Sequence, residues 1–213
     1  MAENTWTIAA PVKKFKLNRP NVNGTPANWG TLRIKVNLNP VNFRLNSKDN
    51  IIESNDIEVD VRLSFTEKDA KYSNYLVTNL KDNSFVLMHS MKIGKVRRAE
   101  KVNDEWVEKQ ITGLICSAKQ VKVFDLVGDH FNSGIIIGKV SQETGPKLIV
   151  QESYRNVKSD TWEHRDVPIL IPDKANKNSS YINKTIFCQG QVVGRTNDGT
   201  AKVYVLADYI SIV

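Results

Sequence analysis

The stretch "FCQGQVVGRTNDGTAKVYVLADYISIV", Phe187–Val213, decides the fold. Two apolar runs flank "RTNDGT", and the Asp198-Gly199 pair within it is a strong signal for a tight hairpin turn. The first run belongs to the segment "TIFCQGQVVG" (185–194), and the second is "AKVYVLADYISIV" (201–213). The stretch therefore predicts two paired strands at the end of an all-β domain.

Three more strands are predicted upstream of this hairpin. Their sequences are "GIIIGKV" (134–140), "KLIVQESYR" (147–155) and "WEHRDVPILI" (162–171), and a polar connection follows the last of them. Five strands with the long connection between the third and the fourth are the order of an OB-fold, a small closed Greek-key barrel. We therefore expect an OB-fold domain over residues 131–213.

Three short stretches carry a family resemblance. They are "IIIGKV" in the opening strand, "YINKTIFCQGQVVGR" before and in the fourth, and "KVYVLADYISIV" in the fifth. In these stretches the C-terminal part resembles the single-stranded DNA-binding proteins of bacteria and their phages and the related primosomal replication-restart proteins. The resemblance implies an OB-fold that holds single-stranded DNA. Many members of that family end in an acidic tail that recruits replication proteins, and the sequence predicts no such tail here.

The first 130 residues predict a β-rich part of uncertain fold. Residues 1–30 hold three prolines and two glycines and are expected to form a basic irregular arm. Alternating apolar residues predict strands at 31–38 and 57–65, with a bulge at Pro40, and long apolar runs predict strands at 84–96 and 106–124. Residues 69–80 favour a short helix. A second OB-like barrel over 31–130 would need its first strand near residue 31, and the "IGKV" found at 93–96 and 137–140 is interpreted as coincidence.

The formal net charge of +7 is concentrated near the N-terminus. Residues 1–48 contain eight basic residues and one acid, whereas basic and acidic residues balance in the rest of the chain. A concentrated positive field favours polyanions, although a solubilising disordered arm explains it equally. No run approaches the length of a membrane span, and Cys116 and Cys188 are expected to be buried reduced thiols. These features predict an intracellular protein, and the resemblance implies the cytoplasm of a bacterial or phage-infected host cell.

Aromatic and cationic residues around the second and third predicted strands of the OB-fold indicate a site for a single strand. Exposed bases stack on aromatic rings while cations follow the phosphates, so Tyr154 and Trp162 are expected to stack successive bases. In the alternative, Trp162 closes the barrel end and Tyr154 packs in the core; Tyr204 and Tyr209 are expected to be structural. The expected nucleic-acid-binding residues are Tyr154, Arg155, Lys158, Trp162, His164, Lys147, Arg195, Lys202 and Lys139 in the C-terminal domain, and Arg33, Lys35, Arg44, Lys95, Arg97 and Arg98 in a basic groove that continues over the first part.

Catalysis is not indicated. Asp56, Glu58 and Asp60 alternate on one strand face and could hold Mg²⁺, but a solvent-facing strand explains them as simply. The three histidines lack metal-ligand spacing, and no glycine-rich phosphate loop is present. We expect no cofactor, no metal and no catalytic residue.

The sequence thus predicts a non-enzymatic, sequence-independent single-stranded DNA-binding protein of replication or recombination, encoded by a phage or mobile element. RNA binding and homo-oligomerisation stay open. The alternatives are a virion structural or assembly protein and a Mg²⁺-dependent nuclease accessory.

Overall fold

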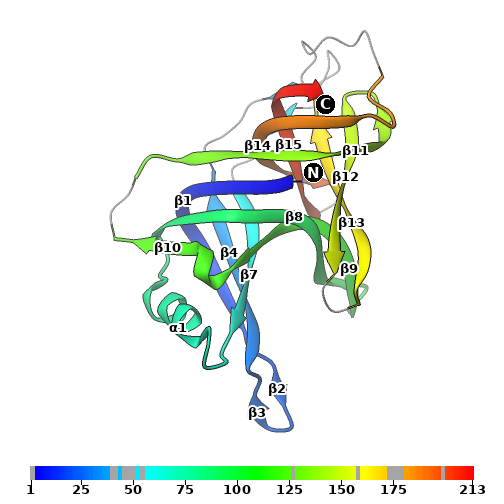
Figure 1. The fold of residues 1–213 in the computed structure, drawn as a ribbon. Helices are drawn as coiled ribbons and strands as arrows, with labels where there is room; N and C mark the ends of the chain where they lie inside the picture. Colours follow the sequence, from blue (N-terminus) through cyan, green and yellow to red (C-terminus); the bar gives the residue numbers. More distant parts are fainter. Residues whose placement is uncertain are drawn as a thin grey trace.

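The computed structural model describes residues 3–38, 43–44, 51–52, 56–125, 128–156, 159–171, 180–197 and 200–213. Two five-stranded barrels make up most of this part of the chain (Figure 1). The first barrel consists of β1 (Glu3–Asn18), β4 (Trp29–Asn37), β7 (Asp56–Ser64), β8 (Phe85–Val102) and β9 (Glu105–Ser117). Its strands follow the order β1-β4-β7-β9-β8 and close on β1, with β7 and β9 parallel. This is the strand order of an OB-fold.

The second barrel repeats that order. It consists of β11 (Phe131–Thr144), β12 (Lys147–Asn156), β13 (Thr161–Leu170), β14 (Thr185–Asn197) and β15 (Thr200–Ile212). β13 and β15 are parallel, and β14 closes the barrel on β11. The predicted all-β fold and the C-terminal OB-fold are confirmed, and the first part is a second OB-like barrel.

Smaller elements connect these strands. They are β2 (Asn21–Val22), β3 (Thr25–Pro26), β5 (Phe43–Arg44), β6 (Ile51–Ile52), α1 (Ala70–Asn79), a 3₁₀ turn (Ala118–Gln120) and β10 (Val121–Phe124). The predicted helix is thus present between the third and fourth strands of the first barrel, and its buried residues are Ser73 and Leu76. Among the described residues, no helix is both long and apolar enough to cross a membrane. Pro40 lies outside the described residues.

The expected irregular arm is wrong over most of its length, because Glu3–Asn18 is one long strand. Trp6, Ile8, Ala10 and Val12 alternate into the core, and this period of two is the strand signal that the proline and glycine content obscured. Pro11 is tolerated because it lies next to Val12, where β1 changes partner from β8 and β11 to β4 through a register shift. The first barrel therefore starts at Glu3 and not near residue 31.

The two copies of "IGKV" lie at different places in the two barrels. Residues 93–96 belong to β8, the fourth strand of the first barrel, whereas residues 137–140 belong to β11, the first strand of the second. Copies of one ancestral repeat would occupy equivalent strands. The interpretation as a coincidence agrees with this placement.

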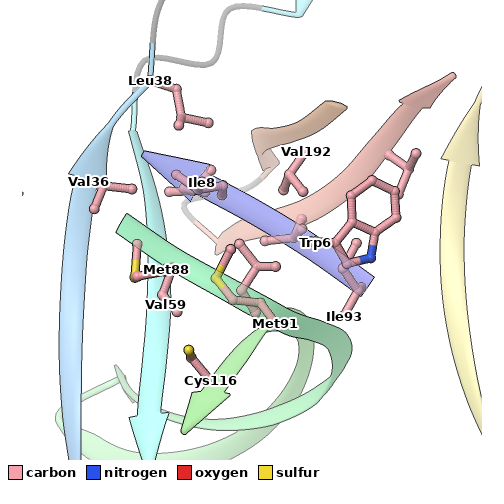
Figure 2. Close-up of a cluster of buried hydrophobic side chains, with 14 of the residues drawn as sticks. Trp6, Ile8, Val36, Leu38, Val59, Met88, Met91, Ile93, Cys116 and Val192 are labelled. Carbon is pink, nitrogen blue, oxygen red and sulfur yellow. The ribbon is translucent and has the colours of Figure 1, made fainter. Parts of the chain in front are cut away.

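β1 joins the two barrels. Its first half pairs with β11 over Glu3–Ala9 and with β8 from Trp6 onward, so it lies between these two strands (Figure 1). We call this contact of β1 with β8 and β11 the seam between the barrels. Figure 2 shows its core, where Trp6 of β1 and Met91 of β8 lie in one hydrophobic cluster with Val192 of β14. Gly134 of β11 leaves the space that the Trp6 indole fills. The barrels therefore share one core and one continuous sheet.

A buried polar cluster reinforces the same seam. Asn4 donates a hydrogen bond to the Ile93 carbonyl at 2.8 Å and another to Glu152 at 2.9 Å, and it accepts one from the Trp6 indole at 2.6 Å. Glu152 in β12 also pairs with Arg165 at 3.2 Å. Because buried polar groups are costly unless they are satisfied, this cluster favours one arrangement of the barrels.

Candidate nucleic-acid interface

A cationic groove crosses the first barrel. Its volume is about 740 Å³, and residues of β1, β4, β7, β8 and β9 line it. Its described cations are Lys16, Arg33, Arg62, Lys95 and Arg97, against the single carboxylate of Asp60. The same groove holds Trp106, from the β8–β9 hairpin. An excess of positive charge in a concave surface focuses the field and favours an anionic ligand.

A second groove, of about 760 Å³, lies between the barrels. The first barrel contributes Arg62, Lys92 and Lys95 to it, and the second contributes residues of β12 and β13. Arg62, Lys95 and Ile115 line both grooves. The two grooves therefore meet, and together they form one path from the first barrel into the cleft between the barrels.

Two tryptophans of the first barrel are exposed: Trp106 lines the groove, whereas Trp29 lies outside the lining on the strand that carries Thr31 and Arg33. The sequence analysis did not include them among the expected binding residues. Trp106 is 73% exposed, and Trp29 is 59% exposed at the start of β4, on the same strand face as Thr31 of the groove wall. A signal was available for Trp29, because it has the same parity as the polar residues Thr31 and Arg33 and so had to point away from the core. Arg62 and Lys16 are further groove residues that the sequence analysis left unassigned.

The carboxylates of β7 are paired with cations. Asp56 contacts Lys13 at 2.8 Å and Lys35 at 3.5 Å, while Asp60 contacts Arg98 at 2.7 Å and Arg33 at 3.2 Å.

Glu58 lies 3.5 Å from Arg98 and 3.8 Å from Arg33. Partial burial raises the pKa of Asp56, but hydrogen bonds from Lys13 and Asn37, together with the positive charges of Lys35 and Lys13, hold the pKa below its usual value. The described residues include no cluster of three or more His, Cys, Asp or Glu side chains suited to a metal.

These pairs also place the predicted cations of the first barrel. Arg33, Lys95 and Arg97 line the groove, as a basic groove over this part requires. Lys35 forms an ion pair with Asp56 at the start of β7. Arg98 is buried against Asp60, so its guanidinium serves the fold and is not presented to a ligand.

Tyr154 and Trp162 lie on opposite faces of the β12–β13 hairpin. Tyr154 is paired in register with Glu163 and Arg155 with Trp162, and neighbouring positions of a strand point to opposite sides. The two rings therefore do not form the single stacking surface that the sequence analysis expected. Trp162 is 70% exposed, so it does not close the barrel end.

The Tyr154 ring already has protein partners. The Arg165 guanidinium lies 3.7 Å from its centroid, and its hydroxyl donates a 2.5 Å hydrogen bond to Glu163. That hydrogen bond raises the pKa of Tyr154 above its usual value and lowers that of Glu163. Tyr154 and His164 line the groove between the barrels, so the β12–β13 hairpin faces the first barrel in part.

The other predicted residues of the second barrel are dispersed. Arg155 pairs with Asp160 at 2.6 Å, and the Lys147 ammonium lies 5.6 Å from the centroid of Tyr204. Lys139 is exposed on β11 and lines neither groove. Lys158 lies outside the described residues, as do the side chains of Arg44, Arg195 and Lys202.

The two tyrosines of β15 differ. Tyr204 is buried, as expected of a structural residue. Tyr209 is 57% exposed, and its ring lies 6.1 Å from the Phe187 ring between centroids, so the burial on which its expected structural role was based is absent. The register shift between Gln189 and Gly190 in the β14–β15 pairing lies opposite this part of β15.

Comparisons with known proteins bear on the fold. No protein-family model and no curated protein matches the chain. A deletion mutant of the single-stranded DNA binding protein from Thermus aquaticus is similar in structure, with a TM-score of 0.64 and 10% identity, covering 100% of this chain and 95% of that chain.

Two further structures give low scores. The N-terminal domain of PriB protein from Thermoanaerobacter tencongensis has a TM-score of 0.27 and 21% identity, over 38% of this chain and 96% of that one. A replication protein A heterotrimer bound to ssDNA has a TM-score of 0.32 and 9% identity, over 97% of this chain and 50% of that one. The resemblance found in the C-terminal sequence is thus a likeness of fold, and with the Thermus aquaticus protein it extends over the whole chain, both OB-like barrels included.

Proposed function

We propose that the protein binds single-stranded DNA without reading its sequence, and that the main binding surface is the cationic groove of the first barrel. The observation that carries this proposal is one groove that combines five cations with the exposed Trp106, while Trp29 is exposed on the same face of β4 as Thr31 of the groove wall. Cations follow the phosphates of a strand, and exposed indoles stack on its bases.

The position of the groove within the fold supports the proposal. OB-folds bind oligonucleotides across their second and third strands, between the loop that joins strands 1 and 2 and the loop that joins strands 4 and 5. In the first barrel these parts are β4 and β7, the segment Arg19–Asn28 and the β8–β9 hairpin. The groove occupies this face, with Trp29 next to the former segment and Trp106 in the hairpin.

The proposal moves the site from the second barrel to the first. In the second barrel, Tyr154 is engaged by Arg165 and Glu163, and the hairpin that carries it forms a wall of the inter-barrel groove. Trp162 remains exposed and is available as an additional contact.

The biological setting belongs to the same proposal. The fold that the chain shares with a single-stranded DNA binding protein supports a non-catalytic role in DNA replication or recombination, in the cytoplasm. Paired carboxylates on β7 weigh against the nuclease alternative, since Asp56, Glu58 and Asp60 already have cationic partners. We also propose that the protein comes from a phage or mobile element and that it self-associates; each of these points needs its own test. A virion assembly protein would self-associate and ignore DNA.

The test is a titration of fluorescein-labelled oligo(dT) followed by anisotropy, together with tryptophan quenching. Trp106→Ala and Trp29→Ala should each weaken binding by about 5- to 150-fold, the equivalent of one lost stacking contact. Tyr72→Ala, which removes an exposed ring on α1 outside both grooves, is the matched control and should leave the affinity unchanged.

Salt provides the second measurement. Single strands release about 0.7 counterions for each phosphate neutralised, so the affinity should fall steeply with NaCl concentration. Duplex DNA should bind more weakly than oligo(dT), because its bases are not free to stack. The proposal fails if oligo(dT) does not bind at low salt, or if the tryptophan variants behave like Tyr72→Ala.

A further inference from the structure

Arg62 and Lys95 occupy the place where the two grooves meet. Both residues line the groove on the first barrel and the groove between the barrels. A strand that passes from one groove to the other must therefore run past these two cations.

Arg62 is the uncompensated cation of the β4–β7 face. Two residues earlier, Asp60 is shared by Arg33 and Arg98, and ion pairs continue from there to Asp56. Arg62 is exposed, and the described part of the chain places no carboxylate within ion-pair distance of it. Arg62 therefore carries a positive charge that no nearby described carboxylate offsets, at the point where the two grooves meet.

Lys95 has a weak partner on the other barrel. Its ammonium lies 4.0 Å from one carboxylate oxygen of Asp166 in β13, and both side chains are substantially exposed. The other oxygen of Asp166 accepts a hydrogen bond from the Gln151 amide at 3.1 Å. An exposed pair at this distance contributes little free energy, so a stronger anion can displace Asp166 from Lys95.

The seam between the barrels keeps Asp166 in place. Its neighbour Arg165 is held by Glu152, and Glu152 by the buried Asn4 of β1. The Arg165 side chain also lies against Gly94 on β8, the residue before Lys95. A Cβ added at Gly94 would lie 3.3 Å from the Arg165 side chain. Asp166 is therefore presented to Lys95 by a rigid contact between β8 and β13.

We propose that Arg62 and Lys95 together bind one backbone phosphate of the bound strand. In the free protein Asp166 pairs with Lys95, and this phosphate displaces Asp166 when DNA binds. The inference rests on the proposed function and adds a specific subsite to it. A phosphate between two cations gains two attractive contacts, whereas Asp166 offers Lys95 one long contact. Asp166 consequently weakens DNA binding, and its removal strengthens it.

The experiment compares oligo(dT) affinities across NaCl concentrations for the full-length wild type and four variants. These are Asp166→Asn, Lys95→Gln, Arg62→Gln and the double variant that combines Asp166→Asn with Lys95→Gln. Asp166→Asn should bind about two- to five-fold more tightly, because an exposed pair is worth up to about 1 kcal/mol. Asparagine keeps the oxygen that accepts from Gln151, which preserves the local structure. Lys95→Gln and Arg62→Gln should each bind more weakly, and each should lower the magnitude of the salt slope by at most about 0.7, because both cations serve one phosphate.

Two controls separate displacement from a general change of charge. Asp82→Asn removes the same charge at an exposed residue that lines neither groove, and it should leave the affinity unchanged. In the Lys95→Gln background, Asp166→Asn should give no gain, because there is no ammonium left to release.

The inference is overturned if Asp166→Asn binds no more tightly than wild type, if Asp82→Asn gives the same gain, or if the gain persists without Lys95. Each of these results leaves the proposed function standing, since the wild type still binds. Failure of the wild type to bind oligo(dT) would instead overturn the proposed function. Circular dichroism of each variant confirms that the fold is retained.

Discussion

Cys116 and Cys188 each lie in the buried core, Cys116 on the first barrel and Cys188 on the second. Burial raises the pKa of each thiol to about 12, since the thiolate is disfavoured away from water. These residues are therefore inert in the folded protein, and each one reports on the barrel that contains it.

Native protein at pH 8 should react with a disulfide reagent such as DTNB far more slowly than the urea-unfolded chain. Only the thiolate attacks, and with a pKa of about 12 less than about one thiol in a thousand is ionised at this pH. Unfolded chain should release two equivalents of chromophore rapidly. Fast labelling of either cysteine in the absence of urea would contradict its burial.

At the scale of elements, the β8–β9 hairpin is attached to the β4–β7 face by Arg98. Its guanidinium forms a buried pair with Asp60 at 2.7 Å and also contacts Glu58 at 3.5 Å. The adjacent Arg97 points the other way, into an exposed pair with Glu108 at 3.4 Å. The side chains are 9% and 74% exposed, so one residue anchors the hairpin and the other borders the groove.

Arg98→Ala should lower the free energy of unfolding by about 1.5–3 kcal/mol, because the Asp60 carboxylate loses its charged hydrogen bonds from Arg98 and keeps only Arg33 as a partner. Arg97→Ala is the matched control and should cost less than about 1 kcal/mol. Urea denaturation followed by circular dichroism measures both. Equal effects in the two variants would show that Arg98 does not anchor the hairpin.

At the scale of the whole molecule, we expect the two barrels to unfold as one cooperative unit, because they share a strand pairing and a core. β1 pairs with strands of both barrels, and Trp6 packs in a core to which both contribute. A methyl group on Gly134 of β11 would collide with the Trp6 ring and with the Thr5 carbonyl of β1. Disturbing this single position should therefore be felt in both barrels.

Gly134→Ala should destabilise the protein by about 3 kcal/mol, the upper range for overpacking a core. Labelling of Cys116 and Cys188 at increasing urea concentration should shift to lower urea for both thiols together, as expected of one transition. Ser133→Ala, at the preceding residue of β11, should shift neither substantially. If only Cys188 becomes reactive earlier, the barrels unfold independently and the cooperative seam is refuted.

The second barrel was predictable because its strands carry an apolar period of two and its turns carry clear signals. The five predicted strands overlap β11 to β15 in order, and Asn197 pairs with Thr200 as the predicted hairpin requires. The Asp198-Gly199 turn itself lies outside the described residues. β1 was missed because Pro11 and the prolines and glycines that follow it up to residue 30 outweighed the alternation of Trp6 and Ile8, although the pattern was present.

What the sequence by itself determined is an all-β chain, a C-terminal OB-fold and a net positive charge. Only the tertiary structure decided which cations are free, because neutralisation depends on partners distant in sequence. Arg97 and Arg98 are adjacent in the chain, yet Asp60 on β7 buries the second and leaves the first at the groove. The pairing of β1 with β11 likewise brings Lys95 to Asp166, and no local pattern encodes a contact between two barrels.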